Sequence, residues 1–123
     1  MLTLTLPFPP SVNAYYRHVG PRVLISRDGR AYRTLVAMCV ADQRGAPRSP
    51  LAGRLQIVMR VYPPDRRRRD LDNLRKALWD ALTAAGVWLD DSQVDDDRAV
   101  RCEPVKGGAV TVQIRELERR EAA

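Results

Sequence analysis

The 123-residue sequence is poor in the residues that build zinc sites and disulfide frameworks, with two cysteines and one histidine. Cys39 and Cys102 form no CxxC motif, and His18 has no second histidine near it, so neither a zinc site nor a disulfide is expected. Each cysteine falls on the apolar side of its periodic segment, where we expect it to pack in the core as a small apolar residue. These shortages exclude protein classes that depend on metal-thiolate or disulfide scaffolds.

Long hydrophobic runs, targeting segments and repeats are also missing. The N-terminal Leu2–Leu6 segment alternates with threonines and has no basic or continuous apolar region, which predicts a cytoplasmic protein without a membrane segment. No Walker motif occurs, so a nucleotide cofactor is not expected. Without a low-complexity linker, residues 1–123 are predicted to form one domain, with a frayed polar tail over 116–123.

Basic residues outnumber acidic ones, and the two signs are segregated along the chain. Nineteen arginines and two lysines stand against fifteen acids, which gives a net charge of +6 and favours a polyanionic partner such as nucleic acid. Residues 1–60 carry nine arginines and two aspartates, a net +7, whereas residues 61–123 carry twelve bases and thirteen acids, a net −1. A GC-rich genome would explain the excess of arginine over lysine, but not this segregation.

The hydrophobic periodicity predicts an α+β domain with a mixed β-sheet and two main helices. Two-residue alternation marks strands over 2–6, 55–61, 98–103 and 109–115. Helical periodicity marks amphipathic helices over 28–44 and 71–85, the first with apolar positions at Tyr32, Leu35, Val36, Cys39 and Val40. The short segment 23–25 is predicted as one arm of a hairpin, and Lys106–Gly108 as the turn joining the last two strands.

The most informative segment begins with four consecutive arginines: Arg66, Arg67, Arg68 and Arg69. Asp70 and Asp72 follow directly. Placing like charges so close together costs electrostatic free energy unless a polyanion binds the arginines and a cation binds the carboxylates. Two ordinary explanations compete, since Asp70 and Asp72 suit a helix start and the arginines suit a solvated face. On a helical wheel, however, Asp72, Lys76 and Asp80 share one polar face. We expect Asp80 to pair with Lys76.

A second acidic segment over 88–97 is predicted as a loop. An acidic loop is usually only solvated, but this one could return Asp90 or Asp91 toward Asp70 and Asp72. Carboxylates gathered so closely repel one another unless a metal compensates them, and oxygen ligands alone favour Mg²⁺ or Mn²⁺. With Lys76 beside them, the pattern predicts hydrolysis of a phosphoryl group.

Three motifs in this order and spacing resemble the RusA family of Holliday junction resolvases. They span 9–18, 64–76 and 86–94, and the agreement extends over nearly the whole chain. The resemblance implies a Mg²⁺-dependent homodimeric endonuclease, with Mn²⁺ as a substitute, that cuts two opposed strands of a four-way DNA junction in bacteria and their prophages. It also implies a role in recombination and repair.

The resemblance places the essential acids at Asp70, Asp72 and Asp91 and the catalytic lysine at Lys76. Arg69 and Asn73 match further motif positions with supporting roles, and the arginine run with Asn73 would contact DNA. The sequence departs from the family pattern at Phe8, where tryptophan is frequent, and at Ala14, which interrupts a more polar run. Tyr16 and Arg17 are DNA-contact candidates, whereas Tyr15 and Tyr16 could equally form a buried aromatic pair.

Two other functions fit the same local features. One is a DNA-junction-binding protein without catalysis, and the other is a Mg²⁺-dependent flap or RNA nuclease. A junction has two equivalent scissile phosphates, so one small chain with one carboxylate cluster is expected to act as a two-fold dimer. The expected dimer contact is apolar, on either the exposed remainder of helix 28–44 or the strand 55–61.

Overall fold

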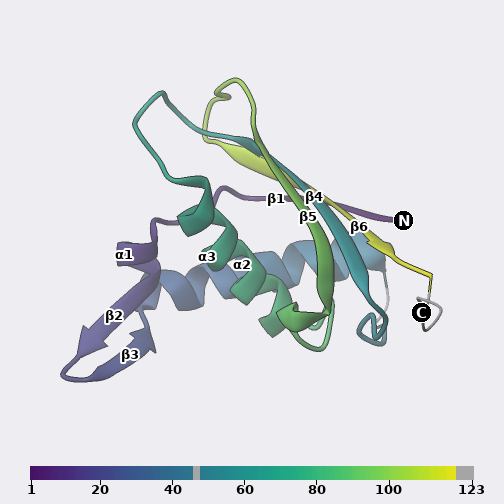
Figure 1. The fold of residues 1–123 in the computed structure, drawn as a ribbon. Coiled ribbons are helices and arrows are strands. Elements are labelled where there is room, and N and C mark those ends of the chain that lie inside the picture. The colour runs from purple at the N-terminus through teal and green to yellow at the C-terminus, as the bar shows by residue number, and fades with distance from the viewer. Residues whose placement is uncertain (46–47, 119–123) are drawn as a thin grey trace.

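A computed structural model describes residues 1–45 and 48–118 and shows a mixed four-stranded sheet with helices packed on one face (Figure 1). The strand order is β1-β6-β4-β5, and β2 and β3 form a separate two-stranded hairpin. The elements are β1 (Leu2–Leu6), α1 (Val12–Tyr15), β2 (Tyr16–Val19), β3 (Arg22–Ile25), α2 (Arg27–Arg44), β4 (Leu55–Tyr62), α3 (Leu71–Ala84), the 3₁₀ turn η1 (Asp91–Gln93), β5 (Val94–Arg101) and β6 (Ala109–Glu116).

The predicted α+β class, mixed sheet and two main helices are confirmed. The segment 23–25 lies in β3, which pairs with β2 in the expected hairpin. The predicted tail is wrong at its first residue, because Glu116 still belongs to β6 and lies opposite Leu55 of β4. Residues 119–123 of that prediction lie outside the described residues. No helix in the described part of the chain has the length and hydrophobicity needed to span a membrane.

The predicted hairpin between the last two strands is wrong, because β4 lies between them. β5 runs parallel to β4, with Val58 opposite Arg98, and β6 runs antiparallel on the other side, with Ile57 opposite Ile114. The Lys106–Gly108 segment is still a turn, with positive φ at Gly107 and Gly108, but it carries the chain across the end of β4. β4 is the most apolar of the three strands and gains most from the central position.

The predicted acidic loop is also wrong over its last three aspartates, which lie in β5. The strand begins at Val94, four residues before the predicted start. An edge strand keeps such side chains in contact with water, and side chains on or next to β4 bind two of them. Arg54 pairs with Asp95 at 2.5 Å, and the Gln56 amide donates to Asp96 at 2.7 Å.

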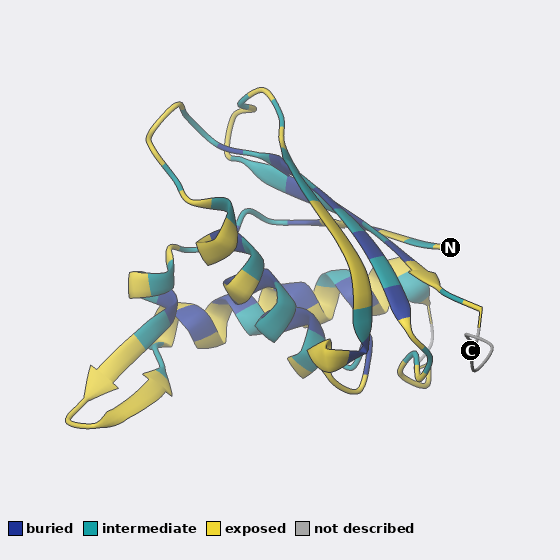
Figure 2. Ribbon diagram, viewed as in Figure 1, coloured by how far each residue is buried: buried dark blue, intermediate teal, exposed yellow. Residues whose placement is uncertain are grey.

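The hydrophobic core lies between the sheet and the two long helices, where Figure 2 shows the buried residues of both layers. Every second side chain of β4 points into it, and Leu55, Ile57, Met59 and Val61 are at most 1% exposed. These four side chains are therefore unavailable for the predicted apolar dimer contact, which on the strand 55–61 would be limited to its half-buried outer face. On α2, the predicted core residue Leu35 is instead 49% exposed. Both cysteines are free and half-buried: Cys39 packs against the core as predicted, whereas Cys102 is not among the residues of the core or packed against it.

Hydrogen bonds at both ends of the projecting β2–β3 hairpin, within residues 11–26, attach it to the body of the protein. Ser11 caps α1, and its side chain accepts from the Ala14 N–H at 3.2 Å. Ser26 caps α2 in the same way, with its hydroxyl accepting from the Gly29 N–H at 3.0 Å. The Ser26 N–H also donates to the Tyr15 carbonyl at 2.9 Å. These bonds place Tyr15, which is fully buried, directly against the long helices.

Candidate active site

The first turn of α3 holds two of the predicted acids. Asp70 is the N-cap residue, and its Oδ1 accepts from the Asp72 N–H at 2.9 Å. The Asp72 side chain is 82% exposed and contacts the guanidinium of Arg75. Both structural roles considered for these acids are therefore present. They do not exhaust the carboxylates, since an ionised carboxylate has about four acceptor positions and Asp70 uses one of them here.

Asp72, Lys76 and Asp91 line one open pocket of about 520 Å³. Tyr16 and Asp90 also line it. The chain enters this region twice, through α3 and through the turn after it, as predicted for the acidic segment. Asp70 lines the adjoining pocket instead, so the predicted gathering of three carboxylates in one pocket is wrong for Asp70. Three of the four predicted catalytic side chains thus surround a common solvent-filled space, with the fourth next to it.

A buried glutamine fixes the turn that carries Asp90 and Asp91. The Gln93 Oε1 accepts from the N–H groups of Leu89 and Asp90, both at 2.8 Å. Its Nε2 donates to the carbonyls of Leu51 and Gly53 at 2.9 and 2.8 Å. Because the Gln93 side chain makes all four bonds and is only 8% exposed, removing it would leave four backbone groups without these partners.

The two neighbouring acids of the turn are not equivalent. The Ser92 hydroxyl donates to the Asp90 carboxylate. Among the described residues, the Asp91 carboxylate has no hydrogen-bond or ion-pair partner. Asp90 is thus engaged within the turn, whereas the Asp91 carboxylate is open to a ligand.

The predicted pairing of Lys76 with Asp80 is wrong. Asp80 instead accepts from Arg33 of α2, whose Nε and Nη2 lie 2.8 and 2.6 Å from Asp80 Oδ2, and from the Tyr15 hydroxyl. Burial and the hydrogen bond to Asp80 raise the pKa of Tyr15 above its usual range. Burial lowers the pKa of Arg33, but its bonds to Tyr15 and Asp80 outweigh this and raise it overall.

The Lys76 ammonium lies over an aromatic ring. Its Nζ is 5.2 Å from the centroid of Tyr16, within cation–π range. The Tyr16 ring packs on that of Tyr15, with centroids 4.7 Å apart. Of the two tyrosines, Tyr15 is fully buried and Tyr16 half-buried, so the pair is the packed one considered from the sequence, with Tyr16 also bordering the pocket. Arg17 is exposed on β2.

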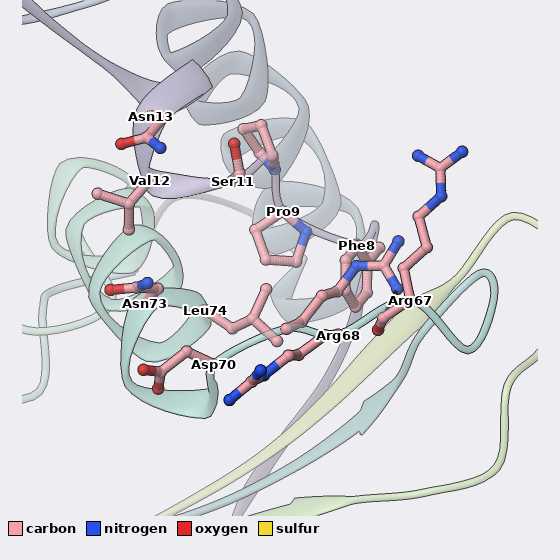
Figure 3. Close-up of a pocket in the computed structure, with 12 residues that line it drawn as sticks. Phe8, Pro9, Ser11, Val12, Asn13, Arg67, Arg68, Asp70, Asn73 and Leu74 are labelled. Atoms are coloured by element: carbon pink, nitrogen blue, oxygen red, sulfur yellow. Dashed lines mark hydrogen bonds between the residues drawn. The ribbon is translucent and has the colours of Figure 1, made fainter.

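Figure 3 shows the adjoining pocket, of about 610 Å³, between the N-terminal connector and the start of α3. Phe8, Pro9 and Ser11 form its connector side, with Asp70 and Asn73 across from them. The Arg69 guanidinium lies 5.3 Å from the centroid of the Phe8 ring. One face of Phe8 is thus already covered by a cation.

The four arginines differ in how firmly the protein holds them. Arg69 is 2.8 Å from Asp65, and Arg66 is 2.7 Å from Glu103, although the side chains of this second pair are 77% and 83% exposed. Asp65 accepts hydrogen bonds from the Arg69 side chain and the Arg67 N–H, and these bonds lower the pKa of Asp65. Arg67 is 85% exposed and reaches Asp65 only at 3.9 Å.

Arg68 is exposed, and it has no hydrogen bond or ion pair with the described residues. Arg67 and Arg68 are therefore the two most available cations of the run.

Comparisons with known proteins match this chain over nearly its whole length. The family "Endodeoxyribonuclease RusA" matches residues 7–115. The crossover junction endodeoxyribonuclease RusA of Escherichia coli (strain K12) is 48% identical over 115 residues, covering 94% of each chain. That of Enterobacteria phage 82 is 50% identical over 115 residues and 93% of each chain. This chain belongs to the RusA family. A further RusA protein, from Shigella sonnei, is 48% identical over 94% of each chain.

The donor set of this RusA-family site fits a hard divalent cation in its chemistry. Asp70, Asp72 and Asp91 offer carboxylate oxygens only, and no histidine or cysteine lines either pocket. Within residues 1–45 and 48–118, however, no three acidic, histidine or cysteine side chains lie close enough together to hold a metal ion. The three carboxylates therefore fit as ligands by type, from two adjoining pockets.

Several residues that shape the site of this RusA-family protein were not predicted from the sequence. Arg75 connects the Asp72 carboxylate to Asp97 of β5, 2.9 Å from its Nε. Its spacing from Asp72 was a usable signal, since residues three apart on a helix are neighbours. Arg33 and Gln93 act on groups more than 40 residues distant in the chain. No local pattern marks these long-range contacts, but the Asp90–Gln93 spacing is that of a capping box and was a usable signal for the local bonds of Gln93.

Proposed function

We propose that this RusA-family endodeoxyribonuclease resolves four-way DNA junctions, by hydrolysing phosphodiester bonds with Mg²⁺, or with Mn²⁺ in its place. The observation that carries the proposal is the shared pocket of Asp72, Lys76 and Asp91 beside an exposed arginine run. The named function of the relatives, which cover nearly the whole chain, gives the substrate.

In this proposal Asp70, Asp72 and Asp91 hold the cation. When bound, the cation supplies an activated water and neutralises charge on the phosphate. Lys76 stabilises the negative charge that develops on the phosphate oxygens. Its ammonium borders the open pocket and has no carboxylate partner among the described residues, which suits a group that acts on a phosphate.

The exposed cations around the pocket would hold the DNA. Arg67 and Arg68 are the most available of the run Arg66–Arg69, and Asn73 lies on the wall of the adjoining pocket. Tyr16 borders the catalytic pocket and Arg17 is exposed beside it in the chain. Phosphate contacts of this kind fix the DNA backbone without reading sequence, which suits a substrate chosen for its shape.

Junction resolution requires two active sites, so we propose a two-fold homodimer. Of the two surfaces expected from the sequence, we favour the outward face of α2, where Leu35 and Met38 are 49% and 63% exposed. These residues lie three positions apart on one side of the helix. Sedimentation without DNA should give about twice the 13.9 kDa chain mass. In a Leu35→Ser, Met38→Ser double variant, the mass measured by sedimentation should fall to that of a single chain.

The setting follows from the substrate and from the relatives. Four-way junctions arise in recombination and repair, and the relatives come from bacteria and a phage. We place the activity in the cytoplasm, on the DNA of a bacterium or its prophage, with no nucleotide cofactor.

A single labelled four-way junction tests the proposal when duplex, flap and hairpin RNA are run beside it. With Mg²⁺ or Mn²⁺, the junction should be cut at two symmetrical positions, and EDTA should stop the reaction. Preferential cutting of the flap or the RNA would replace junction resolution with the second candidate nuclease activity. Tight junction binding without any cut in either metal would favour a non-catalytic binding protein.

A further inference from the structure

The charge of Lys76 is unusually free for a lysine placed between two aspartates on one helix face. Asp72 and Asp80 lie four residues before and after it, and both spacings favour an ion pair. Neither pair forms, because each carboxylate is taken by an arginine: Asp72 by Arg75 and Asp80 by Arg33. Within the described residues, no carboxylate lies within 4.0 Å of the Lys76 ammonium.

The Arg33–Asp80 pair has the geometry of a built contact. Both Nε and Nη2 of the guanidinium reach the same Oδ2, at 2.8 and 2.6 Å, and the two side chains are only 34% and 29% exposed. Nε also lies 3.1 Å from the Tyr15 hydroxyl, which itself donates to Asp80. Asp80 therefore receives bonds from two residues outside α3 and forms no ion pair with Lys76, although both side chains line the same pocket.

The same contact supports the aromatic ring beneath Lys76. Tyr15 is fixed by Asp80 at its hydroxyl and by Ser26 at its carbonyl, where the Ser26 N–H and hydroxyl both donate at 2.9 Å. Tyr16 packs on Tyr15, and Lys76 lies over Tyr16. A cation over a ring keeps its hydrogen-bond donors free for another partner, whereas a cation paired with a carboxylate gives donors to that carboxylate, which also offsets its charge.

We propose that Arg33 is a positioning residue that holds Asp80 away from Lys76 and so keeps the lysine charge available to the scissile phosphate. Arg33 lies on α2 and does not line the catalytic pocket. The proposal rests on the proposed role of Lys76 in cleavage. Arg33 lies outside the three sequence motifs. In this proposal it prevents the Lys76–Asp80 ion pair that the four-residue spacing on α3 otherwise favours.

Arg33→Gln, Asp80→Asn and the double variant test the proposal by rescue. Single-turnover cleavage at saturating protein should slow by roughly three- to fivefold in Arg33→Gln, the range of a partly exposed ion pair. The double variant should return to within about twofold of wild type, because the amide that replaces the Asp80 carboxylate is no longer a charged partner for Lys76. Arg27→Gln, which removes an exposed arginine from the first turn of α2, controls for the lost charge and should cut normally.

A spectroscopic measurement tests the contact without any nuclease activity. The chain has only two lysines, so protein labelled with ¹³C-lysine gives two side-chain signals. In Arg33→Gln without DNA, the Lys76 signal should shift, since the lysine gains a carboxylate partner. The shift should vanish in the double variant. Lys106, on the exposed 106–108 turn, is the internal control and should not move.

Two outcomes would overturn the proposal. One is an unchanged rate and an unchanged Lys76 signal in Arg33→Gln. The other is a slow Arg33→Gln that the Asp80→Asn change does not restore, which would make Arg33 a structural residue only. If Arg33→Gln loses cooperative unfolding, Arg33→Met repeats the comparison with a similar side-chain length. Failure of the wild type to cut any junction would refute the proposed function, while the lysine spectra would still decide the Arg33 contact.

Discussion

Gly29→Ala should destabilise the protein, although the same change stabilises most helices. Gly29 lies in the first turn of α2, where a Cβ atom would stand 2.3 Å from the Tyr15 carbonyl oxygen and 2.9 Å from Ile25 Cγ2. The first of these atoms belongs to the backbone and cannot rotate away. Either α2 or the α1–β2 junction must therefore move.

The size of the effect follows from the bonds at that carbonyl. Alanine contributes about 1 kcal/mol over glycine in a helix. Displacing the Tyr15 carbonyl weakens two hydrogen bonds from Ser26, each worth about 1 kcal/mol, and overpacking costs a further 1–3 kcal/mol or so. We expect a net loss of about 1–3 kcal/mol, which lowers Tm by roughly 4–12 °C in a domain of this size.

Thermal unfolding followed by circular dichroism measures this loss. Ala37→Gly is the matched control, since Ala37 is exposed in the middle of α2 and should cost only the ordinary helix propensity of about 1 kcal/mol. A Gly29→Ala protein as stable as wild type, or more stable, would refute the close packing of α2 against Tyr15.

Three further predictions concern the site and its surroundings. Lys76→Ala should lower the single-turnover rate far more than junction affinity, since its charge acts on the transition state; unchanged cleavage with lost affinity would reduce it to a phosphate contact. Arg67→Gln with Arg68→Gln should weaken binding to all DNA forms and reduce the salt slope by about one per lost contact, and an unchanged slope in a salt titration would contradict this. Burial and the hydrogen bond to Asp80 raise the pKa of Tyr15. The stability that the neutral Tyr15 hydroxyl contributes is therefore complete below about pH 10 and falls as the pH rises toward the pKa in the folded protein. In Tyr15→Phe, the free energy of unfolding measured at alkaline pH should depend less on pH.

Local patterns in the sequence predicted the elements well but their pairing less well. The alternation of β4 and the helical period of α2 and α3 are short-range signals, and their predicted boundaries lie within a residue or two of the observed ones. The Lys106–Gly108 turn was also recognised. A tight turn signal does not reveal that a third strand inserts between the two that it joins, because that pairing is non-local.

At the site, too, the short-range spacing was predicted well and the long-range contacts were not. The spacing of Asp72 and Lys76 places both on one helix face, and they do border one pocket. The i,i+4 rule then favours a Lys76–Asp80 pair, but it cannot include Arg33, 47 residues away in the chain, which binds Asp80 at shorter range and with more donors. The bonds from Gln93 to Leu51 and Gly53 were missed for the same reason, since they join residues 42 and 40 positions apart in the chain.

Asp72→Asn most directly tests whether the pocket of Asp72, Lys76 and Asp91 performs the hydrolysis. This change removes one charge from an 82% exposed side chain and leaves its size intact, so the fold and the arginine run should be unaffected. With Mg²⁺ and a labelled four-way junction, we expect binding at wild-type affinity or slightly tighter, and cleavage reduced by at least about 100-fold. Near-normal cleavage by this variant would contradict the assignment of the site.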